Sequence, residues 1–134
     1  MNEPSIFTRI INGEIPSNIL FQDEQCFVIL TQEPLSPGHL MVIPREEIDH
    51  VWDIGDELYT HLMLIAKKMA HKMREVYDYK RIGMLVEGFG VPHAHVHVFG
   101  LDEPIEPTTI AHAANKRIMG PEELLVEAEK LRIN

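Results

Sequence analysis

The sequence lacks the features of a secreted, membrane-spanning or polyanion-binding protein. Its single cysteine, Cys26, cannot form an intrachain disulfide. No apolar run approaches the roughly 18 residues of a membrane span, and the N-terminus lacks the basic-then-apolar profile of a signal peptide. Lysine and arginine number 12 against 21 acidic residues, so the formal net charge is −9 and does not suit the binding of a nucleic acid polymer. We therefore expect a cytoplasmic protein with no membrane and no nucleic acid partner.

The length sets the number of domains. The chain has 134 residues, of which 45% are hydrophobic, enough for one core and too few for two ordinary domains. We expect a single domain over residues 1–134, with a core over about 5–100 and a C-terminal tail and helix over 101–134.

Apolar periodicity and turn-forming residues predict an α+β fold. Helices are predicted over 5–12, from 53 or 56 to about 77, and over 121–131; strands are predicted over 18–22, 26–31, 39–43, 81–86 and 94–99. Strands joined by short turns favour an antiparallel sheet. The long helix also carries a second apolar stripe, which indicates either burial on two sides or a subunit interface; its residues are Tyr59, Met63, Ala66 and Ala70.

The most informative feature is a row of three histidines, His93, His95 and His97, in an otherwise apolar stretch. On a β-strand, alternate residues project from one face, so the three imidazoles would lie together. An imidazole with an unperturbed pKa of about 6.5 suits proton transfer or nucleophilic attack near neutral pH. The alternatives are a half-buried strand that happens to carry histidine, and an open zinc site of the three-histidine type. Three in a row favours function over packing.

Three segments in this order carry a resemblance to a known family. They cover residues 6–16 (IFTRIINGEIP), 37–44 (PGHLMVIP) and 93–99 (HAHVHVF). With them, the chain from Ile6 through Phe99 resembles the histidine triad (HIT) superfamily of nucleotide hydrolases and nucleotidyl transferases. The resemblance implies a five-stranded antiparallel sheet with flanking helices, and a homodimer in which the two sheets join.

The resemblance also implies chemistry at the α-phosphate of a small nucleotide substrate. In that reading His95 attacks phosphorus and forms a nucleotidyl-histidine intermediate, which requires a free lone pair on one ring nitrogen and a proton on the other. His93 and His97 are then placed to hydrogen-bond phosphate oxygens or to assist the leaving group. His39, on the neighbouring strand, resembles the additional histidine of the family and is expected beside His95.

The resemblance further implies a nucleotide-binding pocket beside this cluster. Two apolar walls would hold the base, and the backbone amides of a glycine-rich turn would cradle phosphate. The residues in these roles are Ile6, Phe7 and Ile10 on one wall, Ile29 and Thr31 opposite, and Gly88 and Gly90 in the turn. The alternative for the apolar residues is ordinary core packing.

The sequence departs from the family pattern at the place of a structural zinc site. Zinc-binding members carry Cys-x-x-Cys in the first helix and a histidine shortly after the third strand. Here Ser5, Thr8 and Glu47 occupy those places, and only the fourth ligand position, His93, is kept. We therefore expect no metal cofactor.

Two further departures concern the nucleotide. Thr31 stands where the family usually has the aspartate that holds the ribose, and a threonine cannot match a carboxylate's charge-assisted hydrogen bonds. The turn over residues 88–92 has no polar side chain to assist a leaving group. Besides a hydrolase or nucleotidyl transferase, the sequence thus leaves open a nucleotide-binding or scaffold protein with weak or no turnover, or a metal-dependent hydrolase that uses the three histidines.

Overall fold

The computed structural model describes residues 3–105 and 119–133. In chain order its elements are α1 (Ile6–Ile11), β1 (Ile19–Gln22), β2 (Cys26–Leu30), β3 (Leu40–Pro44), the short 3₁₀ helix η1 (Val51–Asp53), α2 (Asp56–Val76), β4 (Arg81–Leu85), β5 (Val96–Leu101) and α4 (Pro121–Leu131). The predicted helices and strands are all present, and most of their ends differ from the predicted ones by one or two residues. The predicted single domain over 1–134 includes residues 1–2, 106–118 and 134, which lie outside the described residues.

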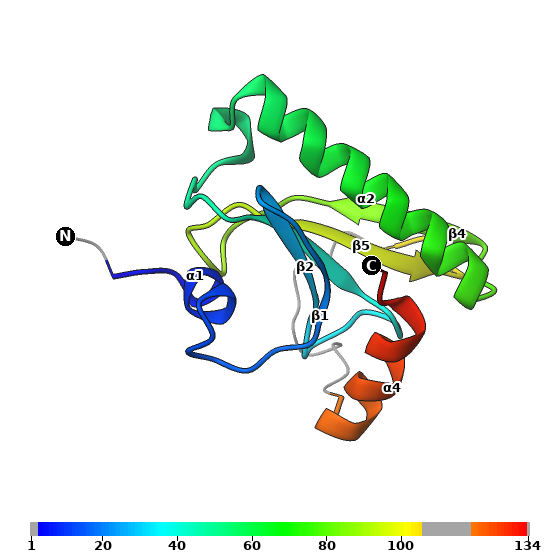
Figure 1. Cartoon of the computed structure of the whole chain (residues 1–134). Helices are drawn as coiled ribbons and strands as arrows, with labels where there is room; N and C mark the ends of the chain where they lie inside the picture. Colours follow the sequence, from blue (N-terminus) through cyan, green and yellow to red (C-terminus); the bar gives the residue numbers. More distant parts are fainter. Residues whose placement is uncertain (1–2, 106–118, 134) are drawn as a thin grey trace.

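The five strands form one antiparallel sheet in the order β1-β2-β3-β5-β4, which confirms the predicted α+β class. Strand β5 lies between β3 and β4, so the histidine-rich segment enters the middle of the sheet (Figure 1). No helix in the described ranges 3–105 and 119–133 has the length and apolar character needed to cross a membrane.

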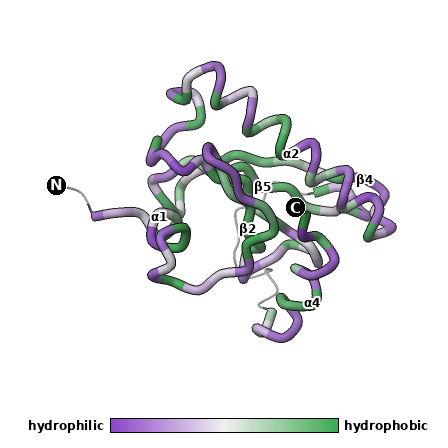
Figure 2. The backbone as a smooth tube through the Cα atoms, viewed as in Figure 1, coloured by the Kyte–Doolittle hydropathy of each residue, from purple (hydrophilic) through white to green (hydrophobic). Residues whose placement is uncertain are grey.

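The sheet separates two apolar clusters because alternate strand residues point to opposite faces. On one face, Val42 and Val98 pack with buried residues of α2 and α4, such as Leu62 and Leu131. Met41, on the opposite face, belongs to a smaller cluster that also contains Phe7 and Ile10 of α1, Phe27, Ile29 and Ile43. Figure 1 shows α2 and α1 on different sides of the sheet, and Figure 2 shows hydrophobic residues along β2 in the interior.

Local signals explain the helix ends. Ser5 caps α1, because its side chain accepts a hydrogen bond from the backbone N–H of Thr8. Asp53 and Asp56 are the residue types that favour a helix cap, and the sequence predicts one of them at the start of α2, but the cap is Gly55 and it makes no side-chain bond. Asp56 instead lies in the first turn of α2, where a carboxylate interacts favourably with the helix dipole.

Strand β5 begins later than predicted, at Val96 rather than at residue 94. The backbone N–H of His93 donates to Val91 (2.8 Å), and that of Ala94 donates to Ile48 (2.7 Å). These bonds hold residues 93 and 94 in a turn, so ladder pairing with β3 starts only at Val96. The prediction that one strand projects all three imidazoles from one face is therefore wrong, and only His97 lies within β5.

Candidate active site

His95 lies immediately before β5, where its ring is held by the backbone of the preceding turn. It is buried, with 6% of its surface exposed. Its Nδ1 is 2.8 Å from the carbonyl oxygen of His93. Because a carbonyl oxygen only accepts, Nδ1 of the neutral ring carries the proton, and the lone pair is on Nε2. The bond therefore selects the tautomer in which Nε2 can act as a nucleophile.

His97 and His39 are hydrogen-bonded to each other. In both rings the proton lies on Nε2, whereas in His95 it lies on Nδ1. The backbone N–H of Leu35 donates to Nδ1 of His39 (3.0 Å), so Nε2 of His39 carries the ring proton. This Nε2 lies 2.9 Å from Nδ1 of His97 and donates to it, which places the proton of His97 on its own Nε2. The centroids of the His97 and His95 rings are 5.0 Å apart. A nucleophilic nitrogen thus lies next to a ring that offers an N–H donor.

His93 does not have the position that the sequence predicts for it. It is completely buried, and both ring nitrogens are bonded: Nε2 lies 2.7 Å from the carbonyl oxygen of Pro44, and Nδ1 lies 2.6 Å from Oγ of Ser5. Burial lowers the pKa of His93, which keeps the ring neutral. The expectation that His93 hydrogen-bonds phosphate oxygens is therefore wrong, because it has no ring nitrogen left for a ligand.

Phe7 connects the apolar cluster to these rings. Its ring meets those of His93 and His95 edge to face, with centroids 5.6 and 5.0 Å apart. Of the residues predicted to form the base pocket, Phe7, Ile10 and Ile29 are buried in one cluster, while Ile6 is 46% exposed. The structure thus brings three of these apolar residues together in one cluster, with Phe7 against His95, and leaves Ile6 outside it.

Thr31 lies next to the His39 end of the site. It follows β2, and its backbone N–H donates to the carbonyl oxygen of His39 (3.2 Å). Its hydroxyl accepts a bond from the backbone N–H of Glu33 (3.3 Å). The side chain is half-buried, so Thr31 reaches His39 through its backbone while its hydroxyl bonds the following turn.

The glycines in the turn before the histidines allow a backbone conformation that other residues rarely adopt. Gly88 has φ +88°, a conformation that favours glycine. Neither the N–H of Gly88 nor that of Gly90 has an acceptor among the residues that the structure describes. Phe89, between them, is 92% exposed. The two amides are therefore available to an anion.

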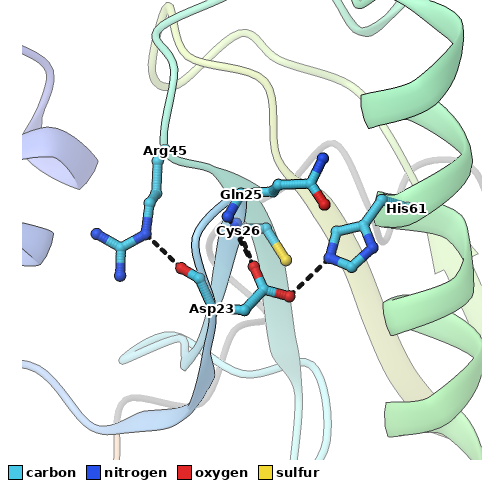
Figure 3. A network of polar contacts seen from close by, with 5 residues as sticks. All are labelled: Asp23, Gln25, Cys26, Arg45 and His61. Carbon is cyan, nitrogen blue, oxygen red and sulfur yellow. Dashed lines mark hydrogen bonds and ion pairs between the residues drawn. The ribbon is translucent and has the colours of Figure 1, made fainter.

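In the described part of the chain, one group of side chains lies close enough together to hold a metal ion. This group does not include the three histidines of the triad. The possible ligand atoms of Asp23, Cys26 and His61 all lie within 4.8 Å of one another (Figure 3). The carboxylate of Asp23 already accepts from two backbone N–H groups, those of Gln25 and Cys26 (both 2.8 Å), and its other oxygen lies 2.6 Å from Nε2 of His61. These bonds account for the cluster as a link between the β1–β2 turn and α2.

The thiol in this cluster is buried, and it stays protonated when no metal is bound. Burial and the nearby Asp23 carboxylate raise the pKa of Cys26 to about 12, so the thiol stays protonated. The three histidines His93, His95 and His97 do not form such a set, since the ring nitrogens of His93 are directed at Pro44 and Ser5. Their convergence on one ion, which the sequence left open, does not occur.

An antiparallel sheet that brings the rings of His95, His97 and His39 together is the arrangement expected of the histidine triad class. Comparison with known proteins agrees: the HIT domain model matches residues 12–104. The chain belongs to the HIT domain family, which supports a role of the nucleotide hydrolase and transferase kind.

Individual relatives extend this likeness over most of the chain. A HIT-like protein of Synechococcus elongatus is 31% identical over 105 residues, which are 75% of this chain and 92% of that protein. The crystal structure of a Bartonella henselae Hit-like protein involved in cell-cycle regulation is 24% identical, covers 98% of this chain and 97% of its own, and has a TM-score of 0.83, which shows the common fold. A HIT family hydrolase from Legionella pneumophila is 28% identical, covers 78% of this chain and 98% of its own, and has a TM-score of 0.67.

Sequence reasoning missed the residues that hold the histidines in place. Ser5 and Glu47 stood out only as departures from a zinc site, and the backbone N–H of Leu35 did not stand out at all. The one local signal was that a serine before an apolar run is a good helix cap. Nothing in the sequence indicated that the same hydroxyl contacts His93, 88 residues further along the chain.

Proposed function

We propose that the protein is a hydrolase or nucleotidyl transferase that acts at the α-phosphate of a nucleotide conjugate, through a covalent intermediate on His95. The bond cleaved would be a phosphoramidate or phosphoanhydride. The observation that carries the proposal is the pair of complementary tautomers: a lone pair on Nε2 of His95 beside an N–H on Nε2 of His97. The likeness to a protein described as a HIT family hydrolase supports it.

The reaction has two displacements at phosphorus. In the first, the lone pair on Nε2 of His95 forms a bond to phosphorus, and the bond to the leaving group breaks with its electron pair. The leaving group takes a proton from solvent. The N–H of His97 and the amides of Gly88 and Gly90 stabilise the charge on the phosphoryl oxygens. In the second, water attacks phosphorus, the phosphorus–nitrogen bond breaks, the water loses its proton to solvent, and a nucleoside monophosphate leaves.

His39 has a supporting role in this scheme. Its bond to Nδ1 of His97 keeps the proton of His97 on the nitrogen that would face the phosphate. Because Nδ1 of His39 is itself held by the backbone N–H of Leu35, rotation of the ring would break both bonds. His39 and His97 therefore act as a unit, and His93 contributes through its carbonyl oxygen rather than its ring.

The decisive experiment traps the intermediate. Wild-type protein is mixed with adenosine 5′-phosphoramidate, quenched within one turnover without acid, and weighed intact by mass spectrometry. We expect one adenylyl group per chain, and peptide mapping should place it on His95. Turnover without any adduct, or an adduct on another residue, would contradict the mechanism. Binding of AMP with neither adduct nor turnover would favour the nucleotide-binding protein, the alternative suggested by Thr31 and by the apolar turn at residues 88–92.

We also propose that two copies pair through β4. This strand lies at the edge of the sheet, and an uncovered edge is a template for pairing with another chain. Met84 on β4 is 58% exposed, and Tyr59, Met63 and Ala70 of the second stripe on α2 are only half-buried against the core. Antiparallel pairing of two β4 strands would continue the sheet from one copy to the next and cover part of this apolar surface.

Sedimentation equilibrium tests this assembly. We expect the wild-type protein to have the mass of a dimer at micromolar concentration, because pairing hides both an edge and an exposed methionine. Met84→Asp should give a folded monomer, whereas Leu125→Asp, a matched change at an exposed position on α4, should leave the dimer intact. A wild-type protein that is monomeric at all concentrations tested would exclude the proposal.

A further inference from the structure

The N-terminus of α1 carries a hydrogen-bonded cluster that reaches the candidate nucleophile. Oε1 of Glu47 accepts from the backbone N–H of Ser5 (2.5 Å) and from the hydroxyl of Thr8 (2.6 Å). Oγ of Ser5 accepts from the backbone N–H of Thr8 (3.1 Å) and lies 2.6 Å from Nδ1 of His93. Four residues from three separate segments are thus bonded to one another.

These are the positions at which zinc-binding members of the family carry their ligands, but the residues here do not fit zinc. Structural zinc sites are built from cysteine thiolates and histidines in a tetrahedron. The cluster offers two hydroxyls and one carboxylate, and both hydroxyls are engaged in bonds within it. The ring of His93 is directed at a carbonyl oxygen on one side and at Ser5 on the other. The misfit is therefore one of donor chemistry, since two neutral hydroxyls stand where a structural zinc takes thiolates.

We propose that Ser5, Thr8 and Glu47 are positioning residues: they form a hydrogen-bond clamp that, without metal, holds His93 and through it sets the orientation of His95. This inference rests on the proposed role of His95 as the nucleophile. It assigns a function to three residues whose side chains do not face the reacting atoms.

The direction of each bond follows from its partner. Nε2 of His93 must donate to the carbonyl oxygen of Pro44, so Nδ1 of the neutral ring must accept. The only donor that the structure places at Nδ1 among the described residues is the hydroxyl of Ser5. That hydroxyl accepts from the N–H of Thr8 and has one proton to donate, for which Nδ1 of His93 at 2.6 Å is a much closer acceptor than Oγ1 of Thr8 at 3.5 Å. Ser5 therefore determines how the His93 ring sits.

The position of His93 affects the orientation of His95 because the backbone of His93 is hydrogen-bonded to the His95 ring. The carbonyl oxygen of His93 accepts the Nδ1 proton of His95, and this bond selects the nucleophilic tautomer. Phe7, on α1, contacts both rings edge to face. A shift of α1 relative to His93 would therefore change both the contact and the bond that orient His95.

Glu47 joins the helix to the segment after β3. The hydroxyl of Thr8 and the backbone N–H of Ser5 lower the pKa of Glu47, so the carboxylate is charged at neutral pH and its bonds are charge-assisted. Pro44, three residues earlier in the same segment, accepts the bond from His93. The carboxylate thus fixes α1 to the segment that also holds the other side of the His93 ring.

The experiment compares kinetics with the tautomers of the histidines in the free protein. For Ser5→Ala we expect kcat with adenosine 5′-phosphoramidate to fall about 10- to 100-fold, since a small misplacement of a nucleophile has that effect, with KM changed less than twofold. Long-range ¹H–¹⁵N NMR should show His95 as the pure Nδ1–H tautomer in the wild type and as a mixture in Ser5→Ala. Glu47→Ala should give a smaller change in the same direction.

Conservative variants and neighbours serve as controls. Glu47→Gln keeps an accepting oxygen and Ser5→Thr keeps the hydroxyl, so both should retain most of kcat. Ser17→Ala and Glu46→Ala, at exposed positions, should match the wild type in both measurements. If Ser5→Ala does not fold, the same readouts on Glu47→Ala decide. Wild-type kcat and an unchanged His95 tautomer in a folded variant would overturn the clamp.

Failure of the clamp is distinguishable from failure of the proposed function. The NMR measurement uses protein without substrate, so it reports on the clamp even if the phosphoramidate is not a substrate. Conversely, an active wild-type protein that forms no adduct on His95 would refute the mechanism while leaving the tautomer result intact.

Discussion

We expect His95→Asn to lower kcat at least about 1,000-fold. Asparagine has no nitrogen lone pair able to attack phosphorus, so the reaction loses its covalent step. The amide nitrogen of asparagine can still donate to the carbonyl oxygen of His93, as Nδ1 of His95 does at 2.8 Å, so the turn before β5 should keep its conformation. Steady-state hydrolysis of adenosine 5′-phosphoramidate measures the effect, and AMP binding by calorimetry should change little.

The matched control for this variant is His71→Asn. His71 is an exposed histidine on α2, on the far face of the sheet from the cluster, and its replacement should leave kcat at the wild-type value. Addition of a chelator such as EDTA should also leave wild-type kcat unchanged. A His95→Asn variant that keeps a tenth or more of the wild-type kcat would refute the covalent mechanism, and strong inhibition by the chelator would favour a metal-dependent one.

Gly100→Ala should destabilise the fold strongly, because an added methyl group meets closer contacts there than at any other glycine. A Cβ at this position in β5 would lie 2.0 to 2.3 Å from three ring atoms of Tyr79, including Cγ, where the side chain has least freedom to move. The hydroxyl of Tyr79 donates to the carbonyl oxygen of Pro37 (2.6 Å), and burial raises the pKa of this phenol, so it stays protonated as a donor. The ring therefore cannot turn aside without breaking that bond.

We expect a loss of about 3 kcal/mol in the free energy of unfolding, the upper range for overpacking a filled site. Urea unfolding monitored by circular dichroism measures it. In Tyr79→Ala the same glycine substitution should cost much less, because the obstructing ring is gone. Gly55→Ala, where an added Cβ meets nothing within 4 Å, should cost no more than about 1 kcal/mol, the loss expected when alanine replaces glycine as a helix cap. Equal losses from Gly100→Ala with and without Tyr79 would show that the ring is not the cause.

Crowding at Gly100 also connects stability to the site. Ser36, beside Pro37, donates its hydroxyl to the carbonyl oxygen of Gly100 (2.8 Å), and the loop formed by residues 35–38 delivers the N–H that fixes His39. Gly38 in this loop has φ +88° and lies against the ring of Tyr77. A displaced Tyr79 would therefore disturb the loop that sets the tautomer of the His39–His97 pair.

Most elements could be predicted from the sequence because their signals are local. Turn residues bound each strand, and Pro121 with two acidic residues marks the start of α4, which begins and ends at the predicted residues. The resemblance placed His39 on the strand next to the histidine row and beside His95, whereas the structure places its ring against that of His97. The start of β5 was misplaced, since a bond from Ala94 to Ile48 in a distant loop decides it.

The sequence by itself determined the fold class and the family, since alternation of apolar residues, turn chemistry and the three motif blocks are readable within short windows. Only the tertiary structure decided what each histidine does. Protonation of a ring nitrogen depends on whether a carbonyl, an amide or a hydroxyl lies opposite it, and those partners come from segments up to 88 residues away. Three histidines that look alike in the sequence therefore differ in burial and in the partners of their ring nitrogens, and the proposed mechanism gives each a different role.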